Sequence, residues 1–472
     1  MFSRLARTRG RWPTPGVRMN KRTHSTRTPF SKTRISIATT GLISTPGIWW
    51  WTTANDDVPN LDSLPAEPSV SRPNLTRGEV SSILSRDAFS HHVNSVPGIN
   101  RYDVTQLASN SPCEDRFVHG KFSSPWNESD KWMSWAVFDG HVGWQTAQLL
   151  TEQLLPFVRC NLSQLKPSSD GFTPDGSVQH AITKAFVDLD DSIIETALAT
   201  SQSNMSLQEK AKKLAPAYAG SCALVSLYDP LTSTLHVACT GDSRAVLGQK
   251  GSDGKWKAIP LSIDQSGSNE DEVARLRKEH PGEDNVVENG RVLGMMVSRA
   301  FGDSRWKWPL DFQKKMKDRF NGPAPLTPRY DVRTPPYLTA EPVVTSTKID
   351  PNQPSFLIMA TDGLWDSLSS QQGVDLVGTW LASRGAQKDP GSGPAYAPFD
   401  FGRFREGVDW RFVEERTTTQ DENAAVHLVR NSLGGNHHEM IAGRLAYDSP
   451  FSRHVRDDIT VQVVFFNTGD KS

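Results

Sequence analysis

The sequence contains little cysteine, with four residues in 472. They stand at positions 113, 160, 222 and 239, and no two of them form a Cys-x-x-Cys pair. This spacing argues against a zinc ribbon, and the low number argues against a disulfide framework. We therefore expect the protein to work in a reducing compartment.

Signatures of the common covalent hydrolases and of nucleotide-binding loops are also missing. No cysteine is followed, after five residues, by the arginine of a phosphate-binding cysteine loop. The chain has neither a Gly-x-Ser-x-Gly elbow nor a Walker-type glycine-rich loop. If the chain is a hydrolase, metal-assisted hydrolysis is the mechanism that remains.

Acidic residues are absent from the first 55 positions, although the whole chain has a net charge of only -1. Arginine and lysine occur there among many serines and threonines. Such an acid-free, basic segment is typical of a mitochondrial transit peptide, and we assign it to residues 1–34. A disordered basic tail is the alternative. The near-neutral total charge gives no reason to expect a nucleic-acid partner.

Long apolar runs are lacking as well. Residues 35–51 come closest to a long apolar run, but threonine, glycine, serine and proline interrupt the segment. It is shorter than the roughly 20 apolar residues that a membrane-spanning helix needs. Its three final tryptophans are residues that favour a membrane interface. Anchorage at the inner mitochondrial membrane and simple membership of the leader both remain open.

The rest of the chain divides into a linker and a globular region. Residues 52–99 are treated as the linker because their first part is rich in proline, serine and aspartate. Apolar runs at 132–138, 234–240, 355–360 and 459–466 predict buried strands, and helical periodicity marks 144–162 and 178–198. Strands joined by short turns, with helices between groups of strands, predict antiparallel sheets covered by helices. A Gly/Pro-rich insertion is expected at about 383–410.

Five short acidic motifs are the most informative part of the globular region. Most of them stand at the ends of apolar runs, where a carboxylate needs a partner. Hard divalent cations such as Mg²⁺ and Mn²⁺ prefer carboxylate, carbonyl and water oxygens. One pair of cations would supply a common partner and would activate a water molecule against a phosphoryl group. The motifs contain Glu114 and Asp115, Asp139 with Gly140, Asp242, Asp362, and Asp457 and Asp458.

His141 follows the second of these motifs directly. A histidine beside metal ligands can itself be a ligand or a general acid. A histidine packed in the core is the structural alternative. The residues alone do not separate these roles.

In their order along the chain, these motifs resemble the metal-dependent serine/threonine phosphatases of the PPM type, also called protein phosphatase 2C-like. The resemblance runs from about residue 100 to 467 and includes Ser-Arg-Ala-Phe-Gly-Asp at 298–303 and Thr-Ala-Glu-Pro at 339–342. It implies one α+β domain over 100–467, a four-layer α/β/β/α sandwich with two central antiparallel sheets flanked by helices. It also implies two Mg²⁺ or Mn²⁺ ions and a weaker third divalent ion.

The resemblance also implies roles for individual residues. Asp139 would bridge both cations, and Glu114 and the Gly140 carbonyl would bind one of them. Asp362 and Asp457 would bind the other, with Asp457 matching the usual family ligand better than Asp458. The remaining roles are a third-cation ligand and a general acid, and they would fall to Asp242 and His141.

One substrate-binding position departs from the family pattern. Most members carry an arginine four residues before the first-motif glutamate, where it grips substrate phosphate, and this chain has Asn110. Asn110, its context, and the segments 334–342 and 423–430 resemble the family branch that acts on pyruvate dehydrogenase. That branch implies mitochondrial location, with the matrix favoured over the intermembrane space. It also implies the pyruvate dehydrogenase alpha subunit, within its complex, as the phosphoprotein substrate.

Three alternatives stay open, and one of them, a membrane-tethered regulator facing the intermembrane space, rests only on residues 35–51. The same chemistry could act on another mitochondrial phosphoprotein, because branch motifs do not define a target. The chain could also be a catalytically inactive, phosphatase-like scaffold. Against the scaffold, every acidic ligand position of the family is filled.

Overall fold

Two antiparallel sheets form the centre of the fold, in a computed structural model that describes residues 74–127, 130–167, 173–384 and 411–468. One sheet has the strand order β1-β2-β16-β15-β9-β10 and the other β14-β8-β7-β4-β3. The strands of the first are β1 (Phe89–His92), β2 (Ile99–Leu107), β16 (Ile459–Phe466), β15 (Ser355–Ala360), β9 (Arg244–Lys250) and β10 (Trp256–Pro260). Those of the second are β14 (Val343–Lys348), β8 (Thr234–Thr240), β7 (Ala223–Asp229), β4 (Lys131–Phe138) and β3 (Arg116–Ser123).

The two sheets pack face to face around one apolar cluster. It joins side chains of β2, β9, β15 and β16 to side chains of β4, β7 and β8, including the fully buried Trp135 and Leu357. Alternate residues of a strand point to opposite faces. The outer faces of the two sheets therefore pack against helices. Because both faces are covered, β4, β15 and β16 are buried along almost their whole length.

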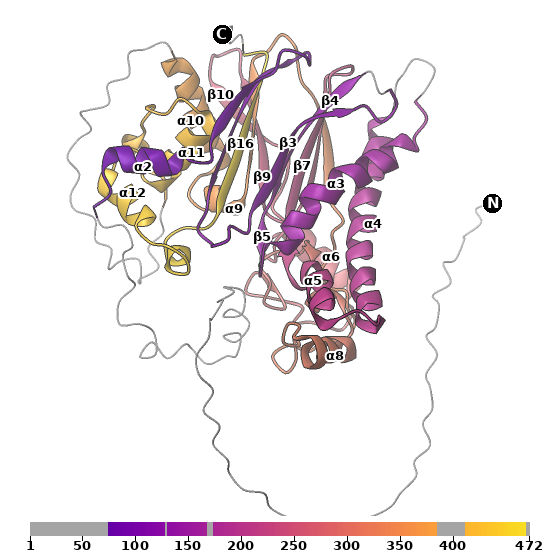
Figure 1. Ribbon diagram of the computed structural model, residues 1–472. Coiled ribbons are helices and arrows are strands. Elements are labelled where there is room, and N and C mark those ends of the chain that lie inside the picture. The colour runs from indigo at the N-terminus through magenta and orange to yellow at the C-terminus, as the bar shows by residue number, and fades with distance from the viewer. Residues whose placement is uncertain (1–73, 128–129, 168–172, 385–410, 469–472) are drawn as a thin grey trace, which may run out of the picture. The chain divides into compact units, whose positions relative to one another are not determined.

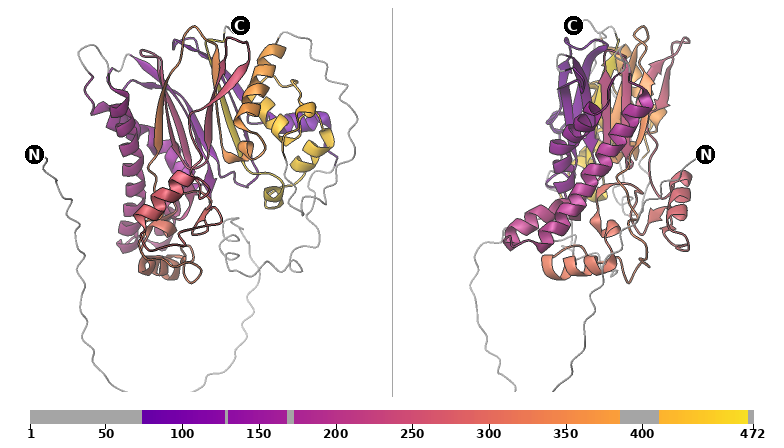
Figure 2. Two further views of the ribbon diagram at one scale, coloured as in Figure 1. Left: turned by 180° about the vertical axis from the view of Figure 1, so that it is seen from behind. Right: turned by 90° about the vertical axis from the view of Figure 1, so that its right-hand side faces the viewer.

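Helices cover both outer faces, and Figure 1 shows them on either side of the paired sheets. Against the six-stranded sheet pack α2 (Arg77–Leu84), α9 (Asp362–Trp365), α10 (Ser370–Ser383), α11 (Ala424–Leu433) and α12 (His438–Leu445). Against the five-stranded sheet pack α3 (Gln145–Ser163), α4 (Asp175–Gln202) and α5 (Leu207–Tyr218). The four-layer sandwich implied by the family resemblance is therefore confirmed, and Figure 2 shows it from two further sides.

A smaller group of elements lies at one end of the sheets, beside β5 in Figure 1. A three-stranded sheet has the order β13-β6-β5, with β5 (Gly140–His141), β6 (Gly220–Ser221) and β13 (Phe301–Gly302). The two-stranded sheet pairs β11 (Val287–Glu288) with β12 (Arg291–Val292). The helices of this group are α6 (Glu270–Glu279), α7 (Ser304–Lys307) and α8 (Leu310–Phe320).

The linker prediction is wrong in its last part, because α2 and β1 lie within 52–99. Thr76 and Glu79 form a reciprocal capping box that starts α2. Val80 and Leu84 are buried in the helix-covered core, and β1 pairs with β2. Composition did not indicate α2 and β1, because only a few apolar residues anchor them within an otherwise polar stretch.

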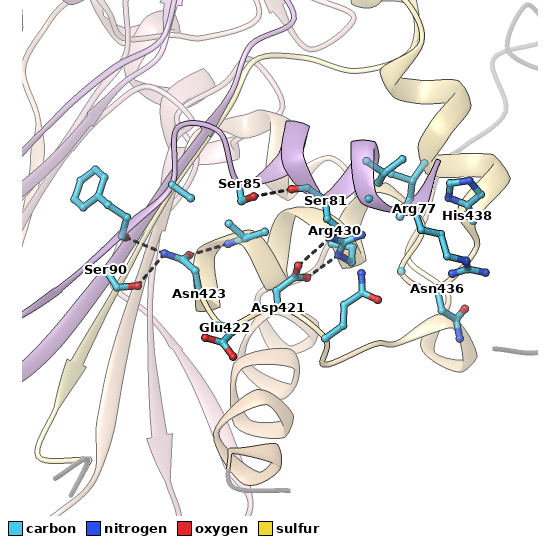
Figure 3. Close-up of a pocket in the computed structure, with 18 residues that line it drawn as sticks. Arg77, Ser81, Ser85, Ser90, Asp421, Glu422, Asn423, Arg430, Asn436 and His438 are labelled. Atoms are coloured by element: carbon cyan, nitrogen blue, oxygen red, sulfur yellow. Dashed lines mark hydrogen bonds and ion pairs between the residues drawn. The ribbon is translucent and has the colours of Figure 1, made fainter. Parts of the chain in front are cut away.

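Figure 3 shows how α2 is held against the C-terminal helices. Arg430 donates to the Ser81 hydroxyl and forms a two-pronged ion pair with Asp421. A pocket of about 680 Å³ lies at this junction. None of the residues that line it belongs to the acidic motifs.

The remaining domain predictions fall largely outside the described ranges. These are the leader at 1–34, the segment at 35–51 and nearly all of the insertion at about 383–410. Among the helices of the described ranges, none has the length and apolar character needed to cross a bilayer.

Candidate active site

Three aspartates from separate strand ends meet at one point. Asp139 follows β4 and Asp242 follows β8, both in the five-stranded sheet, whereas Asp362 follows β15 of the six-stranded sheet. One carboxylate oxygen from each lies within 4.8 Å of the others. The cluster therefore forms where the ends of the two sheets come together.

The electrostatics of this cluster favour a cation. Burial raises the pKa of Asp139 well above its usual value, and the charge of Asp362 adds to the effect. Burial also raises the pKa of Asp242 to about 7, again with a contribution from Asp362. Several carboxylates in a partly buried site repel one another unless a cation is present. Oxygen ligands of this type fit Mg²⁺ or Mn²⁺.

Glu114 approaches the same end of the sheets from the loop before β3. Burial raises the pKa of Glu114 to about 7, and the charge of Asp458 adds to this. A Cβ atom on Gly140 would lie 2.3 Å from the Glu114 carbonyl oxygen. Glycine is therefore required at position 140 for the Glu114 backbone and the Asp139-Gly140 turn to approach this closely.

Asp457 lies beside this cluster, but its carboxylate contacts Arg453 and the backbone of Asp458. Its carboxylate forms an ion pair with Arg453, four residues earlier in the chain. It also accepts a 2.6 Å hydrogen bond from the Asp458 backbone N–H. A Cβ atom on Gly363 would lie 3.1 Å from the Asp457 Cβ, so Asp457 borders the turn that carries Asp362.

Asp458, the neighbour of Asp457, is buried and braces the loop that carries Glu114. Its Oδ1 accepts the backbone N–H groups of Ser109 and Asn110. Its Oδ2 accepts the Asn110 side-chain amide at 3.0 Å and the Glu114 backbone N–H at 2.9 Å. The geometry therefore gives Asp458 a supporting position and leaves its carboxylate fully occupied by N–H donors.

Asn110 belongs to the same hydrogen-bond network as Asp458 and Glu114. Its amide nitrogen donates to Asp458 and, at 3.4 Å, to Glu114. Asn110, which departs from the family pattern, is thus hydrogen-bonded to Asp458, the neighbour of the expected ligand Asp457. Single-residue comparison with a family pattern cannot show such a pairing.

Asp115 also has a supporting position. Its Oδ2 accepts hydrogen bonds from the hydroxyls of Thr361 at 2.9 Å and Thr460 at 2.7 Å. Thr361 directly follows β15 and Thr460 lies at the start of β16, so one buried carboxylate fixes the ends of both strands beside the cluster. The sequence placed Asp115 in an acidic pair but did not indicate this role.

His141 faces a carboxylate that the sequence analysis left without a role. Its Nε2 lies 2.6 Å from Oδ2 of Asp303, which is almost completely buried. Burial would lower the pKa of His141, but the charge of Asp303 and this hydrogen bond outweigh it, so the pKa is raised. The two residues are 162 positions apart, so periodicity and spacing gave no signal for the pair.

Comparison with known proteins gives consistent results. The family model for protein phosphatase 2C matches residues 104–390. A protein phosphatase 2C homologue of Schizosaccharomyces pombe is 41% identical over 379 residues, covering 78% of this chain and 81% of the relative. The mitochondrial pyruvate dehydrogenase (acetyl-transferring) phosphatase 1 of Saccharomyces cerevisiae is 37% identical, covering 80% and 70%. The human protein with that name is 32% identical, covering 84% and 83%.

Proposed function

The chain belongs to the protein phosphatase 2C family and is a metal-dependent protein phosphatase, and from this premise we propose that its substrate is pyruvate dehydrogenase. The observation that carries the proposal is the similarity to pyruvate dehydrogenase phosphatases over at least 80% of the chain. Removal of phosphate from serine on the alpha subunit would reactivate the complex. The acid-free N-terminal segment supports mitochondrial location, and we place the enzyme in the matrix.

The proposed cation site uses the carboxylates described above. Asp139, Glu114, the Gly140 carbonyl, Asp362 and Asp457 would hold two cations, with Asp139 shared between them. Asp242 would contribute to a weaker third site. The close approach of Asp139, Asp242 and Asp362 supports this assignment. When bound, the cations supply Lewis acidity that activates water and offsets phosphoryl charge.

The protein's own groups complete the chemistry. His141 delivers a proton to the seryl oxygen as the phosphorus–oxygen bond breaks, and its imidazole is partly exposed to the site. Asn110 holds the Glu114 loop through Asp458 and offers no guanidinium to the phosphate. Recognition of the substrate then relies on protein surfaces outside the reacting group.

The test is phosphate release from phosphorylated pyruvate dehydrogenase by purified protein with Mn²⁺. A panel of other mitochondrial phosphoproteins serves as the comparison. Preferential release from the alpha subunit supports the proposal, whereas preference for another phosphoprotein would redirect it. A complete lack of release, together with no Mn²⁺ binding at millimolar concentration in calorimetry, would favour the inactive scaffold.

The ligand assignment predicts that Asp139→Asn abolishes cation binding and turnover together. The neutral amide cannot bridge two cations, so we expect calorimetric Mn²⁺ binding to disappear and turnover to fall by more than about 100-fold. The matched control is Asp318→Asn, at an exposed carboxylate on α8. An active Asp139→Asn enzyme with full metal content would contradict the assignment.

The leader and the segment 35–51 form a separate part of the proposal. We propose that residues 1–34 direct import and that the enzyme is then soluble in the matrix. Protease protection in intact and ruptured mitochondria measures this directly. Digestion after rupture of the outer membrane alone would place the enzyme in the intermembrane space, and retention in carbonate-washed membranes would indicate inner-membrane anchorage through 35–51.

A further inference from the structure

Asp303 stands at the N-cap position of α7, where the side chain of an aspartate usually caps the helix. It is the residue before the first turn of α7, and an aspartate there normally accepts a backbone N–H of the helix. In α7 no such side-chain cap exists. The carboxylate instead places Oδ2 at 2.6 Å from His141 Nε2. The Asp303 carboxylate therefore does not cap α7 and faces the His141 imidazole.

The backbone of Asp303 also departs from the ordinary. Its φ and ψ are 45° and 42°, in the left-handed region. That conformation is unfavourable for a non-glycine residue, because the Cβ atom crowds the following carbonyl oxygen. Oδ1 is buried without a hydrogen-bond partner among the described residues. Strain and an unpartnered polar atom persist where the surroundings enforce them, and such residues cluster at functional sites.

The three-stranded sheet aligns the two partners. β6 is its central strand, and Gly220 pairs with His141 of β5 on one side and with Gly302 of β13 on the other. A Cβ atom on Gly220 would lie 2.2 Å from His141 Nε2 and 2.3 Å from Asp303 Oδ2. Only glycine therefore lets the central strand pass directly against the hydrogen-bonded pair.

The turn that carries Asp303 is fixed from its other side. The Asp303 backbone N–H donates to the Ala219 carbonyl at 2.9 Å. The Gly302 N–H donates to Asp190 of α4 at 2.9 Å, and Lys307 bridges Asp190 and the Ala300 carbonyl. These buried contacts leave the carboxylate little freedom to turn away.

From this geometry we infer that Asp303 is the positioning residue for His141 and holds its imidazole in one orientation and one tautomer. A carboxylate can only accept, so Nε2 carries a hydrogen toward Asp303. Nδ1 has no hydrogen-bond partner among the described residues and is the nitrogen available to the substrate. The inference rests on the proposed function, in which His141 delivers a proton to the leaving seryl oxygen.

The test compares substrates that need a proton on the leaving group with substrates that do not. A phosphoserine peptide loses an alkoxide, which needs protonation, whereas p-nitrophenyl phosphate loses a stable anion. We expect His141→Ala and Asp303→Asn each to lower kcat on the peptide by roughly 100-fold, the size of a general-acid contribution. Activity on p-nitrophenyl phosphate should change by less than about 5-fold. The double variant His141→Ala/Asp303→Asn should be no slower than His141→Ala.

Two further measurements separate a positioning role from damage to the fold. Mn²⁺ affinity by calorimetry should stay within about 2-fold in Asp303→Asn, because Asp303 is outside the acidic cluster. Asp318→Asn, on the surface, is the matched control. If Asp303→Asn does not fold by circular dichroism, Gly220→Ala tests the same pair, since its Cβ displaces both partners. It should show the same selective loss on the peptide.

Each outcome has a defined meaning. Equal losses on both substrates in Asp303→Asn, full peptide activity, or multiplicative losses in the double variant would overturn the inference. Loss of selectivity in His141→Ala itself would instead refute the proton-delivery role on which the inference rests. Neither substrate depends on pyruvate dehydrogenase being the natural target, so failure of that assignment is read separately.

Discussion

At the scale of single residues, Asp458 shows how a buried carboxylate can support the acidic cluster without belonging to it. Its two oxygens accept four N–H groups from the loop at 109–114, including that of Glu114. A hydrogen bond to a charged acceptor contributes about 1.5–3 kcal/mol to the free energy of unfolding. A buried N–H donor left without a partner lowers that free energy. Asp458 therefore fixes the backbone from which Glu114 extends.

Replacing Asp458 by asparagine should test this support. The amide keeps the shape but presents an NH₂ group to N–H donors, so we expect the free energy of unfolding to fall by about 1–3 kcal/mol. Mn²⁺ affinity should fall too, because Glu114 loses its anchored backbone. Urea denaturation and calorimetry measure the two effects, with Asp318→Asn as the control. Unchanged Mn²⁺ affinity would contradict the supporting role.

At the scale of secondary-structure elements, α2 ties the start of the domain to its end. Leu84 is fully buried against the cluster that α10, α11 and α12 share with the six-stranded sheet. Ser81 accepts from Arg430 of α11. The helix is short, so its stability comes from this packing and from its capping box more than from its own hydrogen bonds.

Leu84→Ala should lower the free energy of unfolding by about 2–5 kcal/mol, the usual cost of a large-to-small change in a core. The matched control is Leu207→Ala at the exposed start of α5, where the side chain is 67% exposed. That control should change stability by less than about 0.5 kcal/mol. Equal effects of the two changes in urea denaturation would show that α2 is not packed as described.

A second element, α6, is locked to the loop that leads to Asp303. Glu272 forms a two-pronged ion pair with Arg299 and accepts from the Ser298 hydroxyl and from Arg275. Burial alone would raise the pKa of Glu272, but these partners lower it to about 2. A depressed carboxyl pKa contributes stability that is present above the unfolded pKa and is lost as pH falls through the folded value.

For Glu272 this loss falls between roughly pH 4.5 and pH 2, from the ordinary and the lowered pKa. Glu272→Gln should lower stability at pH 7 by about 3 kcal/mol, because it leaves Arg299 buried without its partner. It should also flatten the fall of stability over that acid range. Thermal unfolding of both proteins from pH 7 to pH 3 measures this. Parallel pH profiles would contradict the prediction.

Elements with a clear apolar pattern could be predicted from the sequence. The strands expected at 132–138, 234–240, 355–360 and 459–466 are confirmed as β4, β8, β15 and β16. β2 was missed because Arg101 and Asp103 interrupt its pattern. They form a buried, two-pronged ion pair, and Asp103 also accepts the Ala424 N–H of α11. Only the fold supplies that distant partner.

At the scale of the whole molecule, the site exists because two sheets end at one place. Asp139 and Asp242 come from one sheet and Asp362 from the other. The acidic motifs could be recognised in the sequence, and the family resemblance could order them. The pairs Asn110–Asp458 and His141–Asp303 could not be predicted, because each joins residues that only the packed sheets bring together.

The same arrangement predicts how the enzyme treats substrates of different size. With Asn110 engaged by Asp458, the site lacks the two-pronged phosphate contact that an arginine provides. We expect kcat/KM for a phosphorylated protein to exceed that for a short phosphoserine peptide by more than about 100-fold. Steady-state phosphate release measures both values. Comparable values would show that the catalytic centre itself holds the phosphate tightly.

The attachment of α2 has a consequence for proteolytic maturation. A peptidase that removed the basic leader together with residues beyond Thr76 would take away the capping box and then the buried Val80 and Leu84. The cavity left against α11 and α12 would resemble that of several core truncations at once. If residues 1–34 are a cleaved leader, as proposed above, the cut must therefore fall before Thr76, and α2 marks the limit to which the N-terminus can be trimmed.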